Sequence, residues 1–332
     1  MDPLDVVALA RALIDIDSTT GREREASLWL ADHLRSRGFR VAEQPVDDGR
    51  FNLVALAGER ADVVLSTHVD CVPPFFPSRV EGTRLYGRGS ADAKGILAAQ
   101  VVAAERLRAR GCGRVGLLFV VGEERGSDGA IVANTRPIGS RFLVNGEPTG
   151  NRLASGTRGV WRVRLRAAGR AAHSSRPELG LSAIDRLIDA LVALRSVELP
   201  ASPALGRTFY TVGLISGGVA PNVVPPSAEA EVLFRTVGPA AEVRRAIEPV
   251  AALVAVEEVL EVPPIEMMTV AGFDTAAFAF TTDLALLGNW GRPLLYGPGC
   301  VEVAHSEAEH VEIPALERAV DDYVRLVDAL LE

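Results

Sequence analysis

The sequence predicts an α/β protein in which one domain is inserted into another, and two patterns support this. Towards both ends of the chain, apolar runs of strand length alternate with amphipathic helical segments, which is typical of a mostly parallel sheet flanked by helices. In the middle, strands of alternating polarity follow the ferredoxin-like order β-α-β-β-α-β. We therefore expect a first domain over residues 1–156 and 267–332 and an inserted domain over residues 157–266.

The elements of the first domain follow from caps and apolar runs. A helix is expected to start at Asp2 and Pro3, since Asp is a good N-cap and Pro is tolerated in the first turn. A second helix is expected over residues 22–37 and ends at Gly38. Solid apolar runs then predict buried strands. The predicted strands cover residues 61–67, 114–121 and 140–146. A helix over residues 93–111 is expected between the first and second of them.

The inserted domain is predicted from alternating strands and two amphipathic helices. In chain order these elements cover residues 159–169, 181–195 (helix), 207–215, 227–237, 239–254 (helix) and 256–266. Proline opens the second of these helices, as is common in a first turn. After residue 266 the α/β style returns, with an apolar strand near residue 294 and a long C-terminal helix from about residue 313.

Composition excludes several classes of partner and location. The net charge of −8 argues against nucleic acid as the main partner, because such proteins carry a basic footprint. No apolar run is long enough to span a bilayer, and the acidic N-terminus lacks the basic and apolar regions of a signal peptide. The three cysteines form no CxxC motif and suggest a reducing compartment, so we expect a cytoplasmic protein.

Polar residues gather where the predicted apolar strands end. In an open α/β sheet, ligands bind in the crevice outside the carboxyl ends of the strands, so these residues are expected to face one crevice. They comprise two histidines and several carboxylates: His68, Asp70, Asp92, Glu123, Glu124, Glu147 and His305. Residues i and i+2 share a face of an extended chain, so His68 and Asp70 are expected to lie together.

This set of side chains favours a metal centre. Crowded carboxylates repel one another unless they are protonated or neutralised by cations. Imidazole and carboxylate ligands suit Zn²⁺, and Co²⁺ or Mn²⁺ by similar logic. Two divalent ions sharing a bridging carboxylate would absorb the charge and generate hydroxide near neutral pH.

Each motif alone also has a simpler explanation. His68 and Asp70 could bond each other or cap a loop, and Glu123 and Glu124 could form a solvated loop. The segment GRGSADAKG could cradle phosphate in a nucleotide-binding enzyme, but it lacks the P-loop spacing GxxxxGK[ST]. The occurrence of all these motifs at strand ends, in order, favours a shared metal site over the separate explanations.

On these residues the sequence resembles the M20 metallopeptidase family, which includes acetylornithine deacetylase, succinyl-diaminopimelate desuccinylase, aminoacylase and bacterial glutamate carboxypeptidase. The resemblance covers nearly the whole chain, and it implies that the inserted domain over residues 157–266 is a lid and dimerisation domain. It is carried, in family order, by STHVDCVP, YGRGSADAKG, GEERGS, NGEPT, GRAAHSSRP, APNVVP and VAHSEAEHV.

The resemblance implies a role for each residue at the metal centre. His68 would bind one metal ion, Asp92 would bridge both ions, and His305 would bind the second. Glu124 and Glu147 would complete the two ligand sets. Asp70 would orient His68 through its other ring nitrogen. Glu123 would be the general base, and it would diverge from Glu124 because neighbouring side chains of an extended segment point apart.

The resemblance also implies substrate contacts. His173 would reach the partner subunit's site and stabilise the oxyanion. Asn222 and Arg235 match lid positions that contact substrate, although Arg235 could instead form a salt bridge on the sheet. Gly297 and Gly299 would form a loop beside the substrate carboxylate. The family more often has Asp where this chain has Leu233, so the carboxylate clamp is expected to differ here in its details.

The expected function is therefore hydrolysis of an amide in an N-acyl amino acid or small peptide with a free carboxylate. The preferred activity resembles acetylornithine deacetylase, because the chain is short and contains NGEPT. Succinyl-diaminopimelate desuccinylase, a carrier-linked lysine or ornithine hydrolase, and a dipeptidase or carboxypeptidase share the same residues. A metal-holding binding protein without catalysis is a further alternative, and Glu123 argues against it. A homodimer is expected from His173 and from the edge strands of the inserted domain.

Overall fold

A computed structural model describes residues 4–332 and divides the chain into two compact units. The first unit runs up to Ser155 and also contains Met267–Ala276 and Thr282–Glu332. The second unit contains Gly156–Glu266 and Ala277–Thr281. The predicted domain boundaries differ from this division by Gly156 and by the short return of residues 277–281 to the second unit.

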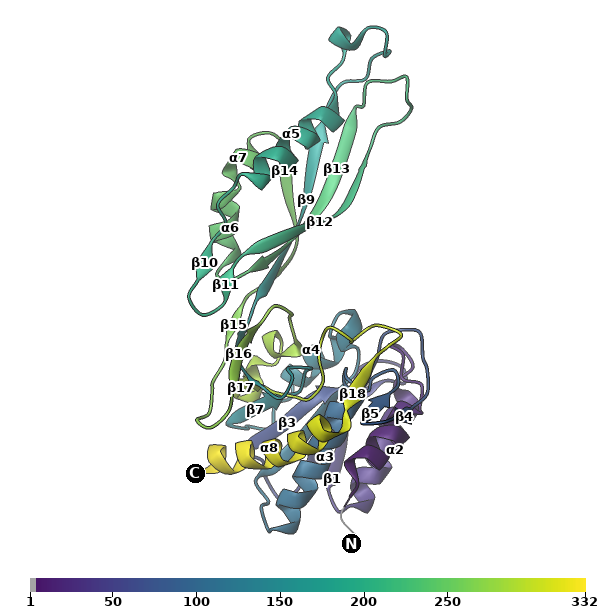
Figure 1. Cartoon of the computed structure of the whole chain (residues 1–332), viewed down its shortest axis with the longest axis vertical. Helices are drawn as coiled ribbons and strands as arrows, with labels where there is room; N and C mark the ends of the chain where they lie inside the picture. The colour runs from purple at the N-terminus through teal and green to yellow at the C-terminus, as the bar shows by residue number, and fades with distance from the viewer. Residues whose placement is uncertain (1–3) are drawn as a thin grey trace. The chain divides into compact units, whose positions relative to one another are not determined.

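The first unit is built on a six-stranded sheet with the order β1-β2-β6-β3-β7-β17 (Figure 1). The strands are β1 (Arg40–Pro45), β2 (Phe51–Leu56), β3 (Val63–His68), β6 (Val115–Val120), β7 (Phe142–Asn145) and β17 (Arg292–Leu295). Strands β6, β3, β7 and β17 are parallel, whereas β2 joins β6, and β1 joins β2, in antiparallel fashion. The carboxyl ends of β3, β6 and β7 therefore meet at one edge of the sheet.

Helices cover both faces of this sheet, as the apolar strands predict. Four helices share one core with alternate residues of the strands, including Leu117 and Phe119 of β6. These are α1 (Val6–Ile14), α2 (Arg24–Ser36), α3 (Lys94–Ala109) and α8 (Ile313–Leu331). On the other face lies α4 (Asp128–Asn134), where Trp290 is fully buried and donates its indole N–H to the carbonyl of Ala133.

The sequence locates the central elements but does not predict β1 and β2, the two strands at one side of the sheet. Strands β3, β6 and β7 lie within the predicted ranges to one residue, because each is a solid apolar run buried on both faces. Strands β1 and β2 are not predicted, and β1 is largely exposed, so it carries no apolar pattern. The first helix is described from Val6 with Asp5 as its N-cap, and the predicted start at Asp2 and Pro3 lies outside the described residues.

The second unit has the element order β-α-β-β-α-β, with its second helix divided in two. Its elements are β9 (Gly159–Ala168), α5 (Ala183–Arg195), β12 (Phe209–Gly217), β13 (Ser227–Thr236), α6 (Ala240–Ala246), α7 (Glu248–Ala251) and β14 (Ala255–Val262). The strands form an antiparallel sheet with the order β12-β13-β9-β14, so β12 and β14 are its edges. Apolar residues of the sheet, among them Trp161 and Phe234, pack against the helices. Arg162 and Arg235 lie on the opposite face, because side chains alternate along a strand.

Small sheets complete the described fold. In the first unit, β4 (Arg79–Glu81) and β5 (Arg84–Tyr86) form a hairpin that β18 (His310–Glu312) extends. A second three-stranded sheet has the order β15-β8-β16, made of Ile265–Glu266, Leu153–Thr157 and Thr275–Phe278. The pairing of β5 with β18 brings the chain around residue 309 beside the loop that carries Asp92.

Candidate metal centre

One buried carboxylate stands between two histidines in the first unit. Asp92 lies in the loop between β5 and α3, His68 ends β3, and His305 lies in the loop before β18. The Nε2 atom of His68 is 3.0 Å from Oδ1 of Asp92, and the Nε2 atom of His305 is 3.4 Å from Oδ2. Each oxygen of Asp92 thus has its own imidazole, which is the arrangement of a carboxylate able to bridge two cations.

Glu124 and Glu147 complete this cluster. The Oε1 atom of Glu124 is 3.0 Å from Nε2 of His305, and ligand atoms of His68, Asp92 and Glu124 lie within 4.8 Å of one another. Glu147 follows β7 and is buried, and its Oε1 atom has no hydrogen-bond partner among the described residues. A buried oxygen without a partner is costly, so this atom fits a cation ligand better than a structural carboxylate.

Asp70 connects the first histidine to the glutamate pair. The Nδ1 atom of His68 is 3.0 Å from the backbone carbonyl of Asp70 and 3.6 Å from its carboxylate. The carboxylate itself accepts backbone N–H groups of Glu123 (3.0 Å) and Glu124 (3.2 Å), and the hydroxyl of Thr20 (2.9 Å). Asp70 therefore orients His68 mainly through its carbonyl, while its carboxylate fixes the backbone of the two glutamates.

The segment that carries Glu123 and Glu124 is helical, so the prediction of an extended segment is wrong. The residues form a short 3₁₀ helix, Glu123–Arg125, which begins after Gly122 in a left-handed conformation (φ 76°). The two amides at its start are the ones that Asp70 accepts, in the manner of a helix N-terminus binding an anion. A turn of 3₁₀ helix also sends neighbouring side chains in different directions, so the proposed division of roles between Glu123 and Glu124 is still geometrically feasible.

The crowded carboxylates of the cluster repel one another, and bound cations would relieve this repulsion. Burial raises the pKa of Glu147, and repulsion from Asp92 and Glu123 raises it further. Burial likewise raises the pKa of Glu123. Hydrogen bonds to Asp92 and Glu124 raise the pKa of His305 to about 10, so this imidazole recruits a proton where no cation is bound. Carboxylates that take up or attract protons in this way fit a site for divalent cations, which would replace those protons.

Gly297 and Gly299 pack closely against the backbone segments that carry Glu147 and Asp92. A Cβ atom on Gly297 would come within 2.5 Å of the carbonyl oxygen of Glu147. Gly299 has a φ of +84° and packs against Ala91, next to Asp92. In the first unit these glycines therefore permit the close approach of the Glu147 and Asp92 segments, and their predicted contact with a substrate carboxylate stays a prediction.

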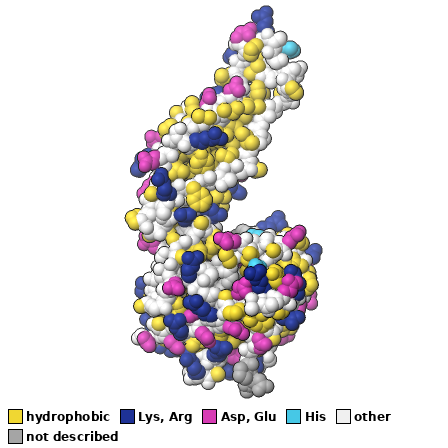
Figure 2. All heavy atoms as spheres, viewed as in Figure 1, with side chains coloured by type: hydrophobic (Ala, Val, Ile, Leu, Met, Phe, Trp, Pro, Cys, Tyr) yellow, Lys and Arg dark blue, Asp and Glu magenta, His cyan; other side chains and the backbone are white. Residues whose placement is uncertain are grey.

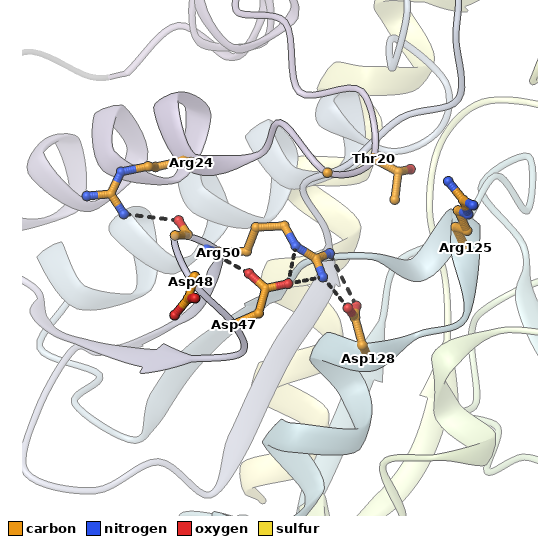
Figure 3. A pocket seen from close by; sticks show the side chains of 9 residues that line it. Thr20, Arg24, Asp47, Asp48, Arg50, Arg125 and Asp128 are labelled. Carbon is orange, nitrogen blue, oxygen red and sulfur yellow. Dashed lines mark hydrogen bonds and ion pairs between the residues drawn. The ribbon is translucent and has the colours of Figure 1, made fainter.

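A salt-bridge network supports the glutamate segment from the side. Figure 3 shows Arg50 between Asp47 and Asp128, in a pocket of about 880 Å³ to which Thr20 and Arg125 also contribute. The guanidinium also lies 3.3 Å from Glu23, whose side chain is fully buried and whose pKa is raised by that burial. Because Asp128 begins α4 directly after the glutamate segment, Arg50 ties that segment to α2 and to the β1–β2 turn.

The predicted substrate residues of the second unit have fewer partners. His173 is exposed, and its Nδ1 atom is 2.9 Å from the hydroxyl of Ser175. Asn222 is exposed and accepts the backbone N–H of Ser174, so it lies beside the His173 segment. Arg235 is half-buried in a pocket of about 330 Å³ on the sheet, and its Nη1 atom has no hydrogen-bond partner in the described part of the chain.

Sequence reasoning missed two carboxylates near the cluster. Asp283 is buried, its Oδ1 atom has no partner among the described residues, and burial raises its pKa to about 6. Glu309 is fully buried and bonds the Asp92 loop. Asp283 lies in a segment without a recognisable motif, whereas Glu309 lies in the HSEAEHV segment and is one of several acidic residues there.

Comparison with known proteins identifies the family. The sequence profile described as Peptidase family M20/M25/M40 matches residues 64–329, which include every predicted metal ligand. The chain belongs to the M20 peptidase family. The chain is thus a metal-dependent hydrolase that acts on peptides, which confirms the predicted enzyme class.

Relatives of the M20 chain include fungal proteins. It is 36% identical over 374 residues to a protein named probable carboxypeptidase from Aspergillus clavatus, covering 98% of this chain and 83% of that one. It is 35% identical over 336 residues to a peptidase M20 domain-containing protein from Schizosaccharomyces pombe, covering 97% and 84%.

Solved structures share the fold of the M20 chain. A tripeptidase from Staphylococcus aureus superposes with a TM-score of 0.83 at 20% identity, covering 99% of each chain. An M20 metallo-carboxypeptidase from Sulfolobus solfataricus superposes with a TM-score of 0.73 at 16% identity, again covering 99% of each. These likenesses confirm the predicted α/β class. No helix in residues 4–332 is long and apolar enough to cross a membrane.

Proposed function

We propose that the protein is a dinuclear metallopeptidase that hydrolyses the amide bond next to a free carboxylate in short peptides. The observation that carries the proposal is the placement of the two Asp92 oxygens opposite His68 and His305. In that arrangement His68 would hold one divalent ion, His305 the other, and Asp92 both. Glu124 and Glu147 would complete the ligand sets.

Each residue of the site would have its own role in the hydrolysis. Two divalent ions, Zn²⁺ foremost and Co²⁺ or Mn²⁺ as alternatives, would supply Lewis-acid activation of water and of the scissile carbonyl. Glu123 would accept the proton of the attacking water and donate it to the leaving amine. Asp70 would hold Glu123 in place through the backbone N–H that it accepts. His173 would stabilise the oxyanion of the tetrahedral intermediate.

The Nη1 atom of Arg235, which has no hydrogen-bond partner among the described residues, supports a substrate with a free carboxylate. An Arg whose Nη1 lacks a partner, in a half-buried pocket, offers a bidentate fork for an anion. The name of several relatives, probable carboxypeptidase, supports a peptide as the substrate of this chain. Asn222 would contact the same substrate. The acetylornithine deacetylase activity that the sequence suggests stays a prediction, and we rank it below carboxypeptidase or dipeptidase activity.

The deciding experiment measures amine release by protein loaded with Zn²⁺ or Co²⁺. The panel contains dipeptides, tripeptides and N-blocked dipeptides, each with a free carboxylate or as the C-terminal amide, together with acetylornithine and succinyl-diaminopimelate. We expect turnover of the free-carboxylate peptides and little turnover of the matched amides. Equal turnover of both forms would contradict the carboxylate requirement. Turnover of acetylornithine alone would favour the deacetylase.

We further propose that the protein acts as a homodimer through its second unit. Apolar side chains stand exposed there, as Figure 2 shows for the visible face, among them Ile188 and Val192 of α5 and Leu214 and Ile215 of β12. Strand β12 is an edge of its sheet and can pair with another copy. Light scattering is expected to give a dimer, and a Leu214→Glu variant is expected to dissociate. A fully active monomer would contradict this proposal.

A further inference from the structure

A buried carboxylate outside the predicted ligand set holds the loop that carries Asp92. The Oε1 atom of Glu309 accepts three backbone N–H groups, from Gly89 at 2.9 Å, Ala91 at 3.2 Å and Asp92 at 3.2 Å. Its Oε2 atom accepts a hydrogen bond from Nη1 of Arg88. Glu309 is fully buried and Arg88 is 2% exposed, so these bonds lie in a dry environment, where charged hydrogen bonds are strong.

Three converging N–H groups form a concave site for an anion. Successive backbone amides that point at one oxygen bind negative charge well, as they do in phosphate-binding loops. Here the chain supplies the anion itself. Glu309 reaches the loop because β18, which it precedes, pairs with β5, which leads into the loop. The resemblance of GRGSADAKG to a phosphate-cradling loop therefore has a physical basis, and an internal carboxylate takes the anion's place.

The loop is constrained on both sides of Asp92. Arg88 also donates from Nε to the carbonyl of Pro74 at 3.2 Å. Lys94, buried at the start of α3, donates to the carbonyl of Ile16 at 2.6 Å. Glu309 is the described side chain that bonds the backbone of Asp92 itself, so the position of the bridging carboxylate depends directly on it.

We infer that Glu309 is a positioning residue that presents Asp92 to both metal ions through the backbone of residues 89–92. This inference rests on the proposed dinuclear function, because it assigns Asp92 to both ions. Partners that orient a metal ligand typically change metal affinity by about 10- to 100-fold when they are replaced. A carboxylate that merely stabilised the fold would leave the affinity of the folded protein unchanged.

The test is a titration of the metal-free full chain with Co²⁺, followed by visible absorption. Glu309→Gln keeps the size of the side chain but removes the charge that Arg88 and the three amides share. Glu312→Gln is the matched control, because the carboxylate of Glu312, at the end of β18, is also paired with an arginine, Arg84. Its side chain is 42% exposed, and its hydrogen bonds within residues 4–332 go to Arg84 and Thr83 and not to the loop that carries Asp92. We expect about 10- to 100-fold weaker Co²⁺ binding for Glu309→Gln and wild-type binding for Glu312→Gln. We also expect excess Co²⁺ to restore most of the kcat of Glu309→Gln.

The outcomes separate this inference from the proposed function. A folded Glu309→Gln variant that binds Co²⁺ like the wild type overturns the inference. A wild-type protein that binds no Co²⁺ overturns the proposed function, whatever the variant does. If Glu309→Gln fails to fold, amide hydrogen exchange of the metal-free wild type decides. Slow exchange at Gly89, Ala91 and Asp92 supports the inference, and exchange at the rate of an exposed loop overturns it.

Discussion

The candidate metal centre of the first unit and the predicted substrate residues of the second unit differ in how far the chain already satisfies their polar groups. In the candidate metal centre, Oε1 of Glu147 has no partner among the described residues, but both oxygens of Asp92, both of Asp70 and both ring nitrogens of His68 have partners. In the second unit, His173 is exposed, with Ser175 bonded to one of its ring nitrogens, and Nη1 of Arg235 has no hydrogen-bond partner within residues 4–332.

This difference separates a preorganised site from groups that are available for a ligand. Side chains held by internal hydrogen bonds pay little entropy when the reaction begins, so the metal centre can fix the geometry of the chemistry. A half-buried guanidinium without a full set of partners gains most when an anion arrives. Substitutions in the first unit should therefore change metal binding or kcat, whereas those in the second should act only once substrate is present.

The largest effect is expected for Glu123→Gln. Removing the general base should lower kcat by about 10²–10⁴-fold, because proton transfer from water then lacks an acceptor. Metal content should stay at the wild-type value, since Glu123 is not among the proposed ligands. Metal analysis and steady-state kinetics on the best peptide test both statements. Wild-type kcat in this variant would show that another group is the base, and Asp283 would be the next one to replace.

A smaller loss is expected for His173→Ala in the second unit. Loss of one oxyanion donor typically lowers kcat by about 10²–10³-fold, and metal affinity should not change. Mixing this variant with Glu123→Gln tests whether the histidine serves the partner's site. If it does, mixed dimers contain one complete site and activity reappears. If the mixture stays as inactive as its parents, His173 acts within its own subunit or not at all.

The convergence of the proposed metal ligands could be predicted from the sequence more readily than the residues that support them. His68, Asp92, Glu124 and His305 follow apolar strands or lie in distinctive motifs, so their convergence could be expected, and the structure brings these four together. Glu309 could not be recognised in the same way, because its partners are backbone amides some 220 residues earlier in the chain.

Local conformation was also beyond the sequence pattern. Glu123 and Glu124 follow a buried strand, so the sequence predicts that the extended backbone continues through them. Instead, Gly122 adopts a left-handed backbone conformation, and a 3₁₀ helix begins at Glu123. Strand β1 is an edge strand with mostly exposed side chains, so it lacks the apolar run that marked β3. Tertiary hydrogen bonds decide such positions, and no short window of sequence contains them.

Arg235→Gln tests whether the guanidinium of Arg235 binds the substrate carboxylate. Loss of a hydrogen bond to a charged group costs about 1.5–3 kcal/mol, which corresponds to roughly 10- to 150-fold in kcat/KM. Most of that loss should appear in KM, and C-terminal amide substrates should lose nothing further. Arg164→Gln is the matched control, because Arg164 lies on the same sheet face but is paired with Glu231 at 2.6 Å. Equal losses in both variants would mean that Arg235 supports the sheet rather than the substrate.

The smallest expected effect concerns Cys71, the neighbour of Asp70 in the chain, and tests whether water reaches its thiol. Cys71 is buried, and burial raises its thiol pKa from 9.0 to about 12. An unfolded chain releases this proton near pH 9, whereas the native protein keeps it, so the contribution to stability is complete below pH 9 and is lost as the pH rises towards 12. The slope is about 1.4 kcal/mol of unfolding free energy per pH unit in that window.

Urea unfolding of metal-free wild type and Cys71→Ala between pH 8 and 10.5 isolates this contribution, because the other titrating groups are common to both proteins. The stability advantage of the wild type over Cys71→Ala should shrink as the pH rises above 9. Cys300→Ala removes an exposed thiol and serves as the control, with a stability change expected within about 0.5 kcal/mol of zero. An advantage that stays constant with pH would mean that water reaches Cys71. The backbone that carries Asp70 would then be less rigidly enclosed than the hydrogen bonds around the metal centre indicate.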